Sequence, residues 1–424
     1  MDYSVATGST AKPVRAMHYG PGTDVTLLKE RLRSDAVYRK ARHFEKLPSG
    51  ADAISHFLHL NDRAEGIPVV ETNRPIVLYG AGNLGALARD HLELAGCPPI
   101  LVIDRNADAY RFDAGWANYH LCTPERVPAG LKQDALLAVS ISTSPFVPLL
   151  EALAADGWQK CVPFYDLAQV FHSKHPLNNG WVGKALTEAD MALTQEVIET
   201  WADDRSRADH LRFAAWRLCR EELYFAEASV DIHAKFFIPE VAPYLTPHAR
   251  VVDGGAHHGS YIERLVETTD AIGHIWAVEP DPSNLIRLRQ SKMLRAAVSV
   301  HDAVLSDKAE SVPFHCGLGY ASQISATGAV MRRTTTLDEM NLNPTVIKLH
   351  LEGHELAALK GAERTIQSHR PLVMATVYHN EDGLFRTADW MMSNLDGYRF
   401  LLRAHGWCGT GLIIYGLPDG LRVS

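Results

Sequence analysis

Apolar positions form short strand-like runs separated by helix-like stretches in two parts of the chain. In the first part, PIVLYG, PPILVID, ALLAVSIS and KCVPFYD are strand-like, and helical segments such as AGNLGALARDHLELAG lie between them. In the second part, the strand-like runs are ARVVDGG, HIWAVEP, VSVHDAVL, TVIKLHLEG, RPLVMATVYH, YRFLLRAH and GLIIYGLP. Strands that alternate with helices indicate parallel pairing, so the pattern predicts two α/β units.

A stretch with few helix breakers separates the two units. Thr187–Glu227 carries many apolar positions at helical spacing, which predicts a helical bridge whose charged residues, such as Arg220 and Glu221, lie on its solvated surface. The expected domains are an N-terminal polar and helical region at 1–73, a Rossmann-like α/β domain at 74–175, the helical bridge at 176–245 and a second α/β domain at 246–424.

Helical spacing also predicts individual elements outside the strands. The N-terminal region is helical in character at Asp24–Arg42 and Ala51–Leu60. Helices of the second α/β domain are expected at Ser260–Glu267, Pro282–Lys292, Glu355–Ser368 and Thr387–Asn394, and a β-hairpin at Ser311–Glu339.

Composition narrows the class of protein. The 424 residues, 46% of them hydrophobic and 22% charged, are typical of a globular protein of two or three domains. The formal charge is −8 and no run of Lys and Arg occurs, so nucleic acid is not an expected partner. Because no apolar stretch is long enough to cross a bilayer and the first residues lack a signal-peptide core, we expect a cytoplasmic protein without a membrane span. The six cysteines lie far apart, which argues against a disulfide framework.

The segment VVDGGAHHGSYIERL is the most informative part of the chain. A strand ends at Asp253, and a turn that contains Gly255 and Gly259 opens a helix, at the position where open α/β sheets bind ligands. Glu279 ends the next strand, where a carboxylate can accept two hydrogen bonds from a ribose diol. Asp302 ends the third strand and is positioned to accept from an adenine amino group. These strand ends predict a site for an adenosyl ligand.

The glycine spacing argues against a dinucleotide as the adenosyl ligand. Asp253-x-Gly255-x-x-x-Gly259 differs from the G-x-G-x-x-G that a pyrophosphate prefers. A purely structural turn is the alternative interpretation, and Glu279 at the next strand end argues against it.

A family resemblance follows from these motifs. VVDGGAHHGSY, AVEPDPSNL, HDAVLSD, TTTLDEM, VIKLHLEGHELAALKGAERTI and VYHNEDGL, in that order, resemble the FkbM-type methyltransferase family over roughly residues 236–416. The resemblance implies a class I methyltransferase fold with a doubly wound sheet of seven strands, S-adenosylmethionine as cofactor, and O-methylation of a hydroxyl on a sugar, a glycan precursor or a secondary metabolite. It also implies cofactor-binding residues: Asp253, Gly255 and Gly259 at the methionine end, Glu279 at the ribose and Asp302 at the adenine. His257 lies in the same turn and is expected to contact the cofactor as well.

The chain departs from the family pattern in its fourth strand. The family usually reads I-K-x-D-x-E-G-x-E, and His350 stands where the aspartate is expected. The pair His257 and His258 also occupies a turn where smaller residues are usual. Both departures concern acid–base chemistry more than cofactor binding.

His350 is the leading candidate for a general base that takes the proton of the acceptor hydroxyl. Glu352 is expected to orient that ring or to act as the base itself, and Lys348 to stabilise anionic charge or pair with Glu352. Tyr378 and His379, at the end of the fifth strand, are expected to line the acceptor pocket. The alternative is that Lys348, His350 and Glu352 alternate onto one solvated or interface face of the strand.

A metal site is a second alternative at the same strand. His350-x-Glu352-x-His354, with His257 or His379 nearby, has enough imidazole and carboxylate groups for zinc or a similar ion. The turn at Gly353 leaves the side-chain directions open, and we expect no metal.

The first α/β unit carries its own glycine motif. Gly80-x-Gly82-x-x-Gly85 follows a strand and opens a helix, and Asp104 ends the next strand, which is the context of a dinucleotide fingerprint. A turn kept only for packing is the alternative, in a unit that docks substrate or a partner subunit.

Three functions therefore remain open. The first is methylation of a small-molecule or glycan acceptor. The second is an NAD(P)- or sugar-nucleotide-dependent enzyme that works through the nucleotide site at Gly80–Asp104. The third is a degenerate, non-catalytic methyltransferase that serves as a binding module, with His350 as the mark of lost activity. A second copy of the chain is a further candidate partner.

Overall fold

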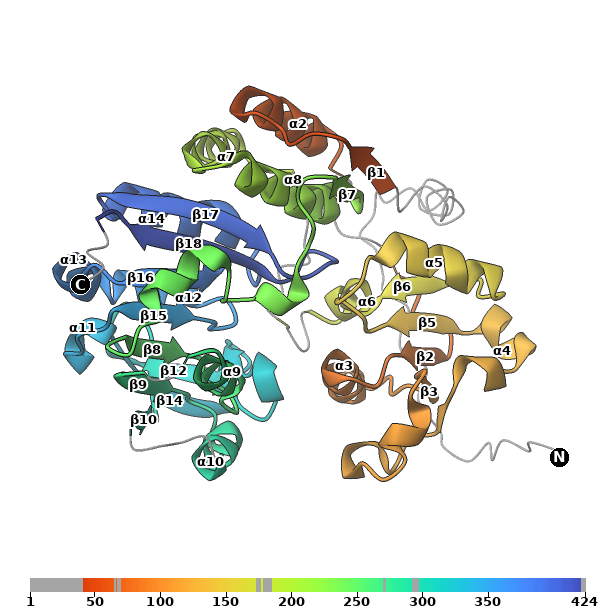
Figure 1. Cartoon of the computed structure of the whole chain (residues 1–424). Helices are drawn as coiled ribbons and strands as arrows, with labels where there is room; N and C mark the ends of the chain where they lie inside the picture. Colours follow the sequence, from red (N-terminus) through yellow and green to blue (C-terminus); the bar gives the residue numbers. More distant parts are fainter. Residues whose placement is uncertain are drawn as a thin grey trace.

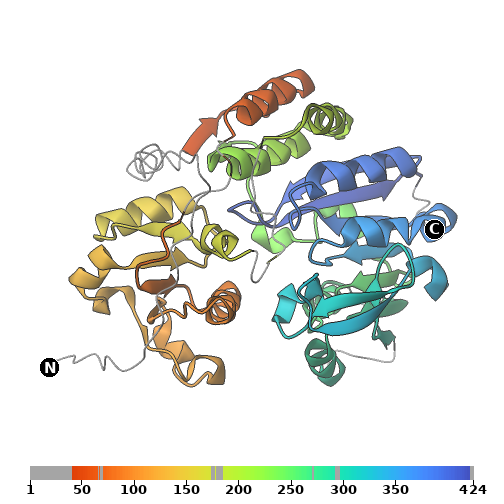
Figure 2. The same cartoon turned by 180° about the vertical axis from the view of Figure 1, so that it is seen from behind.

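The computed structural model describes residues 41–64, 66, 70–172, 177, 185–269, 272–291 and 297–420. Two α/β units lie side by side, and a layer of helices lies along one side of the pair (Figures 1 and 2). The helix predicted at Asp24–Arg42 falls outside the described residues except for its last two positions, which begin a strand.

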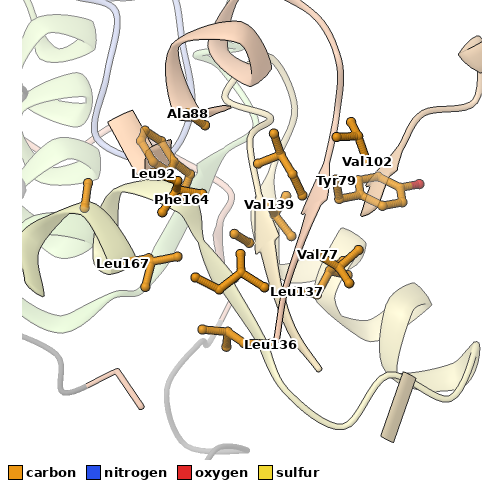
Figure 3. Close-up of a cluster of buried hydrophobic side chains, with 14 of the residues drawn as sticks. Val77, Tyr79, Ala88, Leu92, Val102, Leu136, Leu137, Val139, Phe164 and Leu167 are labelled. Carbon is orange, nitrogen blue, oxygen red and sulfur yellow. The ribbon is translucent and has the colours of Figure 1, made fainter. Parts of the chain in front are cut away.

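The N-terminal unit is a parallel sheet in the order β4-β3-β2-β5-β6. Its strands are β2 (Ile76–Tyr79), β3 (Leu101–Ile103), β4 (Leu121–Cys122), β5 (Leu136–Val139) and β6 (Cys161–Pro163), and its main helices are α3 (Asn83–Leu94), α4 (Ala129–Asp134), α5 (Phe146–Ala155) and α6 (Phe164–Val170). The residues of β2 and β5 are all buried, as expected for strands covered on both faces. Figure 3 shows Leu92 of α3 and Phe164 of α6 among the apolar side chains of this core. The Rossmann-like fold predicted for this unit is confirmed.

The helical layer is formed by two segments that are distant in sequence. Helices α7 (Glu188–Thr200) and α8 (Asp204–Cys219) form the predicted bridge, and α2 (Gly50–Asp62) packs against them. Strand β1 (Ala41–Phe44) pairs in parallel with β7 (Glu222–Phe225). Part of the region 1–73 therefore packs on the bridge.

The expectation that Arg220 and Glu221 lie on a solvated surface is wrong. Arg220 is 2% exposed and lies 3.3 Å from the Asp166 carboxylate of α6, and Glu221 forms ion pairs with Arg42 and Arg63. These charges are buried because α6 on one side and the segment around β1 and α2 on the other cover the end of α8. The hydrophobic pattern within α8 gives no information about that cover.

The C-terminal unit contains the central sheet of the protein. Within the described residues, seven strands form it in the order β10-β9-β8-β15-β16-β18-β17, with β18 antiparallel to both neighbours and the other pairs parallel. The strands are β8 (Arg250–Gly254), β9 (His274–Val278), β10 (Val298–His301), β15 (Val346–Leu349), β16 (Leu372–Thr376), β17 (Tyr398–Ala404) and β18 (Leu412–Pro418). Every predicted strand contributes to this sheet, so the predicted doubly wound sheet of seven strands is confirmed.

Helices flank this sheet. One predicted helix and one predicted strand are each split into two shorter elements. The helices are α9 (Ser260–Thr268), α10 (Pro282–Gln290), α11 (Leu337–Met340), α12 (Glu355–Lys360), α13 (Glu363–His369) and α14 (Ala388–Asn394). The single helix expected at Glu355–Ser368 is interrupted at Gly361, where an added Cβ would lie 2.0 Å from the Ser306 carbonyl oxygen. The strand expected in VSVHDAVL leaves the main sheet after His301, and its second half is β11 (Val304–Leu305).

The C-terminal unit contains a second, smaller sheet. Its order is β11-β14-β12-β13, and β12 (Ser311–His315) pairs antiparallel with β14 (Val330–Thr335) as the predicted hairpin requires; β13 is Gln323–Ile324. All six cysteines lie in described positions and are free thiols. Among the described helices, none has the length and apolar character needed to cross a bilayer.

Candidate active site

One cleft lies between the two α/β units. Its volume is about 870 Å³, and residues that follow the carboxyl ends of strands in both sheets line it. The cleft follows β8 and β2, and each of these strands lies where the strand order of its sheet reverses, which is where open α/β sheets bind ligands. The predicted site residues that line it are Gly255, His257, Glu279, Lys348, His350 and Glu352 from one unit and Gly80, Gly82 and Asp104 from the other.

The turn after β8 is shaped by backbone that few side chains tolerate. Gly255 has a φ of +72°, and a Cβ there would lie 2.0 Å from the carbonyl oxygen of His350. His257 has a φ of +50°, and its backbone N–H donates to Glu279 Oε2 at 2.7 Å. Gly259, with a φ of +91°, precedes α9 and packs near Leu288 rather than lining the cleft. The turn therefore brings bare backbone to the cleft wall.

Glu279 is a buried carboxylate at the end of β9. It is 4% exposed, lines the cleft, and accepts from the backbone N–H of Asp281 at 2.8 Å as well as from that of His257. Burial raises the pKa of Glu279, although these hydrogen bonds partly oppose the shift. Glu279 thus ties the β8 turn to the end of β9 and keeps a carboxylate at the cleft.

Asp253 does not line the cleft. It is fully buried, and Lys348 Nζ donates to its Oδ1 at 2.7 Å and to the Gly255 carbonyl at 3.0 Å. The parallel register of β8 and β15 sets Asp253 beside Lys348, so the two side chains meet on one face of the sheet. Asp253 supports the turn through Lys348, and it does not line the cleft, where the family pattern implied a direct contact with the methionine end. The pair also takes Lys348 away from Glu352.

Asp302 lies outside the cleft as well. Its side chain is exposed and forms an ion pair with Arg332 of β14. The reason is that the chain leaves the main sheet after β10 to join β14 through β11, which turns Asp302 toward β14. Ala303 and Val304 line the cleft in its place, so the structure does not support the expected contact of Asp302 with adenine.

His350, Glu352 and His379 meet beyond the ends of β15 and β16. Glu352 Oε1 lies 3.2 Å from His350 Nε2 and 3.3 Å from His379 Nε2. Strand β15 ends at Leu349 and Glu352 has a φ of +51°, so the alternation of Lys348, His350 and Glu352 on one strand face does not hold. Instead, Lys348 points to Asp253 and the other two side chains join His379.

Further residues contact the cluster, and of the two residues expected in the acceptor pocket, Tyr378 lines the cleft and His379 does not. Glu355 Oε1 lies 3.0 Å from His379 Nδ1 and accepts from Thr376 Oγ1 at 2.6 Å, and the Tyr378 hydroxyl lies 3.1 Å from His350 Nε2. Lys235 also lines the cleft. Lys235 comes from the irregular segment before β8, where no periodic pattern assigns a side chain a direction. Glu355 belongs to the quoted family motif, but it was expected only as the start of a helix.

Burial and neighbouring charges set the protonation states of the cluster. Burial lowers the pKa of His350 to about 3, and the positive charge of Lys235 adds to the effect. Burial alone would lower the pKa of His379, but the carboxylates of Glu352 and Glu355 raise it to about 9. Burial alone would raise the pKa of Glu352, but the charge of His379 and hydrogen bonds from both histidines lower it to about 2. At pH 7 His350 is therefore neutral, next to a carboxylate that a charged imidazole balances.

The N-terminal glycine motif folds as predicted, and its acid is engaged by backbone. Gly80 has a φ of +108°, and a Cβ on Gly85 would lie 2.1 Å from the Gly80 carbonyl oxygen, so Gly85 lies beneath the turn. Asp104 accepts from the N–H of Ala81 at 2.7 Å through Oδ2 and from the N–H of Asn106 at 2.8 Å through Oδ1. Gly80, Gly82 and Asp104 nevertheless face the same cleft as His350.

The strand order of the C-terminal unit, with its antiparallel seventh strand and a cleft at the end of its central strand, defines a class I methyltransferase fold. Residues 253–406 match the model of the methyltransferase FkbM domain family. The C-terminal unit of this chain is therefore an FkbM methyltransferase domain.

One similar solved structure agrees with this assignment of the fold. The crystal structure of methyltransferase FkbM from Methylobacillus flagellatus KT is 18% identical, with a TM-score of 0.55 over 92% of this chain and 97% of that chain. The precorrin-6y C5,15-methyltransferase from Geobacter metallireducens GS-15 is 15% identical, with a TM-score of 0.29 over 46% of this chain and 95% of that chain, which is too low to bear on the fold. No curated protein matches the chain significantly.

Proposed function

We propose that this protein is an S-adenosylmethionine-dependent O-methyltransferase that methylates a hydroxyl of a sugar, a glycan precursor or a secondary metabolite. The observation that carries the proposal is the cleft in which the β8 turn and Glu279 adjoin the cluster of His350, Glu352 and His379. An FkbM methyltransferase domain that spans all of these residues supports it.

The residues at the β8 turn fit the cofactor. A side chain at position 255 would collide with the His350 carbonyl, so this wall consists of bare backbone against which a ligand can lie. Oε1 of Glu279 accepts from the Asp281 N–H and from Asn284 Nδ2, whereas Oε2 accepts from the His257 N–H alone and has a second acceptor position for a ribose hydroxyl. Arg264 and Lys235 line the cleft with positive charge suited to the methionine carboxylate. Gly255, His257 and Glu279 are therefore the proposed cofactor contacts.

The cluster at His350 fits the handling of a hydroxyl proton. The bound cofactor supplies an electrophilic methyl group on a sulfonium sulfur. Because burial keeps the His350 ring neutral, it can accept a hydrogen bond from an acceptor hydroxyl and orient the oxygen for attack. The Glu352 carboxylate, 3.2 Å from Nε2, stabilises the positive charge that the ring takes up as the proton moves. His379 and Glu355 hold Glu352 and the strand ends in position.

The shared cleft supports a role for the N-terminal unit in acceptor binding. Gly80, Gly82 and Asp104 line the same cavity as His350, and its volume is near the upper end of the range for ligand pockets, about 300–1,000 Å³. The glycine turn after β2 and the N-terminus of α3 that follows it are suited to a nucleotide phosphate. An acceptor sugar linked to a nucleotide would therefore occupy both halves, with its hydroxyl at His350.

Calorimetry with S-adenosylhomocysteine tests the cofactor site. We expect Glu279→Ala to weaken binding by about 10- to 100-fold, the loss of a hydrogen bond to a charged group. Asp302→Ala is the matched control, because this strand-end carboxylate pairs with Arg332 outside the cleft and its loss should leave the affinity unchanged.

The same titration separates the rival functions. A wild-type chain that binds NAD(P) and does not bind S-adenosylhomocysteine would contradict the proposal and favour a nucleotide-dependent enzyme of the N-terminal unit. Tight binding of S-adenosylhomocysteine without turnover on any acceptor would favour a binding module.

A further inference from the structure

Three side chains of the types that bind metal ions lie close together beside the cleft. One ligand atom from each of His350, Glu352 and His379 lies within 4.8 Å of the other two, and within the described residues these three form the single group of this kind. Glu352 Oε1 lies 3.2 Å and 3.3 Å from the two imidazole Nε2 atoms. Donors about 2.1 Å from a tetrahedral ion are about 3.4 Å apart, so these separations match the edges of a ligand set.

His379 points a buried nitrogen at this group. The ring is 2% exposed, and its Nε2 lies 3.3 Å from Glu352 Oε1. Its other nitrogen, Nδ1, lies 3.0 Å from Glu355 Oε1, and Glu355 is fixed by the N–H of Leu351 at 2.8 Å and by Thr376. A carboxylate that holds one nitrogen of an imidazole, with the other nitrogen turned to a shared centre, is the arrangement that orients metal-binding histidines.

Charge favours a cation at this centre. Glu352 and Glu355 bring two carboxylates into a buried space, and buried charges are stable only when they are paired or bind a metal. Within the described residues, His379 lies between the two carboxylates, and Lys235 faces them from another element, over the Tyr378 ring at 5.9 Å. A divalent ion bound to His379 Nε2 would take the place of the proton that this ring otherwise shares with the carboxylates.

We propose that His350, Glu352 and His379 bind one divalent transition-metal ion of the Zn²⁺ class, and that the acceptor hydroxyl coordinates this ion from the cleft. Two imidazoles and a carboxylate suit Zn²⁺ or Co²⁺ better than Mg²⁺, which prefers oxygen ligands. Because His350 and Glu352 line the cleft, the ion keeps an open coordination position toward it, as catalytic zinc sites do. The role of the ion rests on the proposed methyl transfer, whereas its binding does not.

The ion would make the proton of the acceptor hydroxyl easier to remove. A hydroxyl bound to a divalent ion loses its proton more readily, as metal-bound water does. The proton passes to water in the cleft, the oxygen forms a bond to the methyl carbon as the carbon–sulfur bond breaks, and S-adenosylhomocysteine leaves with the electron pair of that bond. His350 then acts as a ligand and does not have to hold the proton.

Metal binding by the full-length chain tests the proposal. After removal of metals with a chelator, the wild type should bind one equivalent of Co²⁺, with a visible absorption band, and Zn²⁺ should displace it. Glu352→Gln and His350→Ala should each lose this stoichiometric binding. Glu355→Gln should weaken it by about 10- to 100-fold, the usual effect of removing the carboxylate that orients a ligating histidine.

His354→Gln is the matched control. His354 completes the H-x-E-x-H pattern in the sequence, but its Nε2 contacts Ser306 Oγ at 2.9 Å and it lies outside the group, so one equivalent should still bind. Circular dichroism confirms that each variant is folded. The proposal is overturned if the folded wild type binds no stoichiometric ion, or if Glu352→Gln and His350→Ala both bind it as the wild type does.

S-adenosylhomocysteine binding distinguishes this proposal from the methyltransferase proposal. If the chelated, metal-free chain methylates its acceptor at the full rate, the role of the ion in methyl transfer is wrong, and methyl transfer stands. If the chain holds its ion and never binds S-adenosylhomocysteine, the ion site stands and methyl transfer is wrong.

Discussion

Replacing His350 with alanine is expected to lower kcat by about 10²- to 10⁴-fold, the range for loss of a group that handles a proton in the reaction. The affinity for S-adenosylhomocysteine should stay within about twofold, because the side chain adjoins Glu352 and Tyr378 while the cofactor contacts lie at the β8 turn and Glu279. The measurement is steady-state turnover on the acceptor that reacts fastest, with calorimetry on the same preparation.

His350→Asp separates a chemical role from a packing role. Aspartate is the residue of the family pattern at this position, and it is both a base and an oxygen ligand, so it should recover part of the lost kcat. If His350→Ala keeps the wild-type kcat, His350 neither takes the proton nor holds a group that does.

The largest effect on stability is expected at the ion pair of Asp253 and Lys348. Both side chains are almost completely buried, at 0% and 3% exposure. Asp253→Ala leaves the ammonium of Lys348 without its carboxylate, and breaking a buried pair in this way typically costs about 3–5 kcal/mol. We expect a lower urea midpoint for unfolding of the C-terminal unit, monitored by circular dichroism.

The double variant Asp253→Asn with Lys348→Met provides the control. It removes both charges and should recover much of the stability, because replacing both partners of a buried pair is often close to neutral. An Asp253→Ala variant that keeps its stability within about 1 kcal/mol and yet loses S-adenosylhomocysteine binding would contradict the supporting role. In that case Asp253 contacts the cofactor directly, as the family pattern implies.

The strands were predictable because their signals are local, whereas the seven-stranded sheet that they form was implied by the family resemblance. Every strand of the C-terminal sheet is a short apolar run next to a turn, and Gly255 and Glu279 stand at strand ends where parallel sheets bind ligands. The fold and the location of the cleft follow from these positions. The meeting of His350, Glu352 and His379 was only partly predictable, since it depends on the positive φ of Glu352, which the sequence indicates only through the neighbouring Gly353.

The errors in the predicted site arise from contacts between segments that are distant in sequence. Asp302 is turned away by the departure of the chain toward β14, and Arg220 is buried by α6, which comes from another unit. Lys235 reaches the cleft from an irregular segment before β8. The periodicity within a single element carries no information about such contacts. The positions of Asp302, Arg220 and Lys235 are set by the tertiary structure.

The central claim is that the C-terminal turn, rather than the N-terminal one, holds the adenosyl cofactor. A crystal structure of the full chain grown with S-adenosylhomocysteine tests it most directly. We predict the ribose hydroxyls at the Glu279 carboxylate, the amino-acid end against Gly255, and the sulfur facing the side of the cleft that carries His350. A nucleoside bound at Gly80 and Asp104, with the β8 turn empty, would contradict the account.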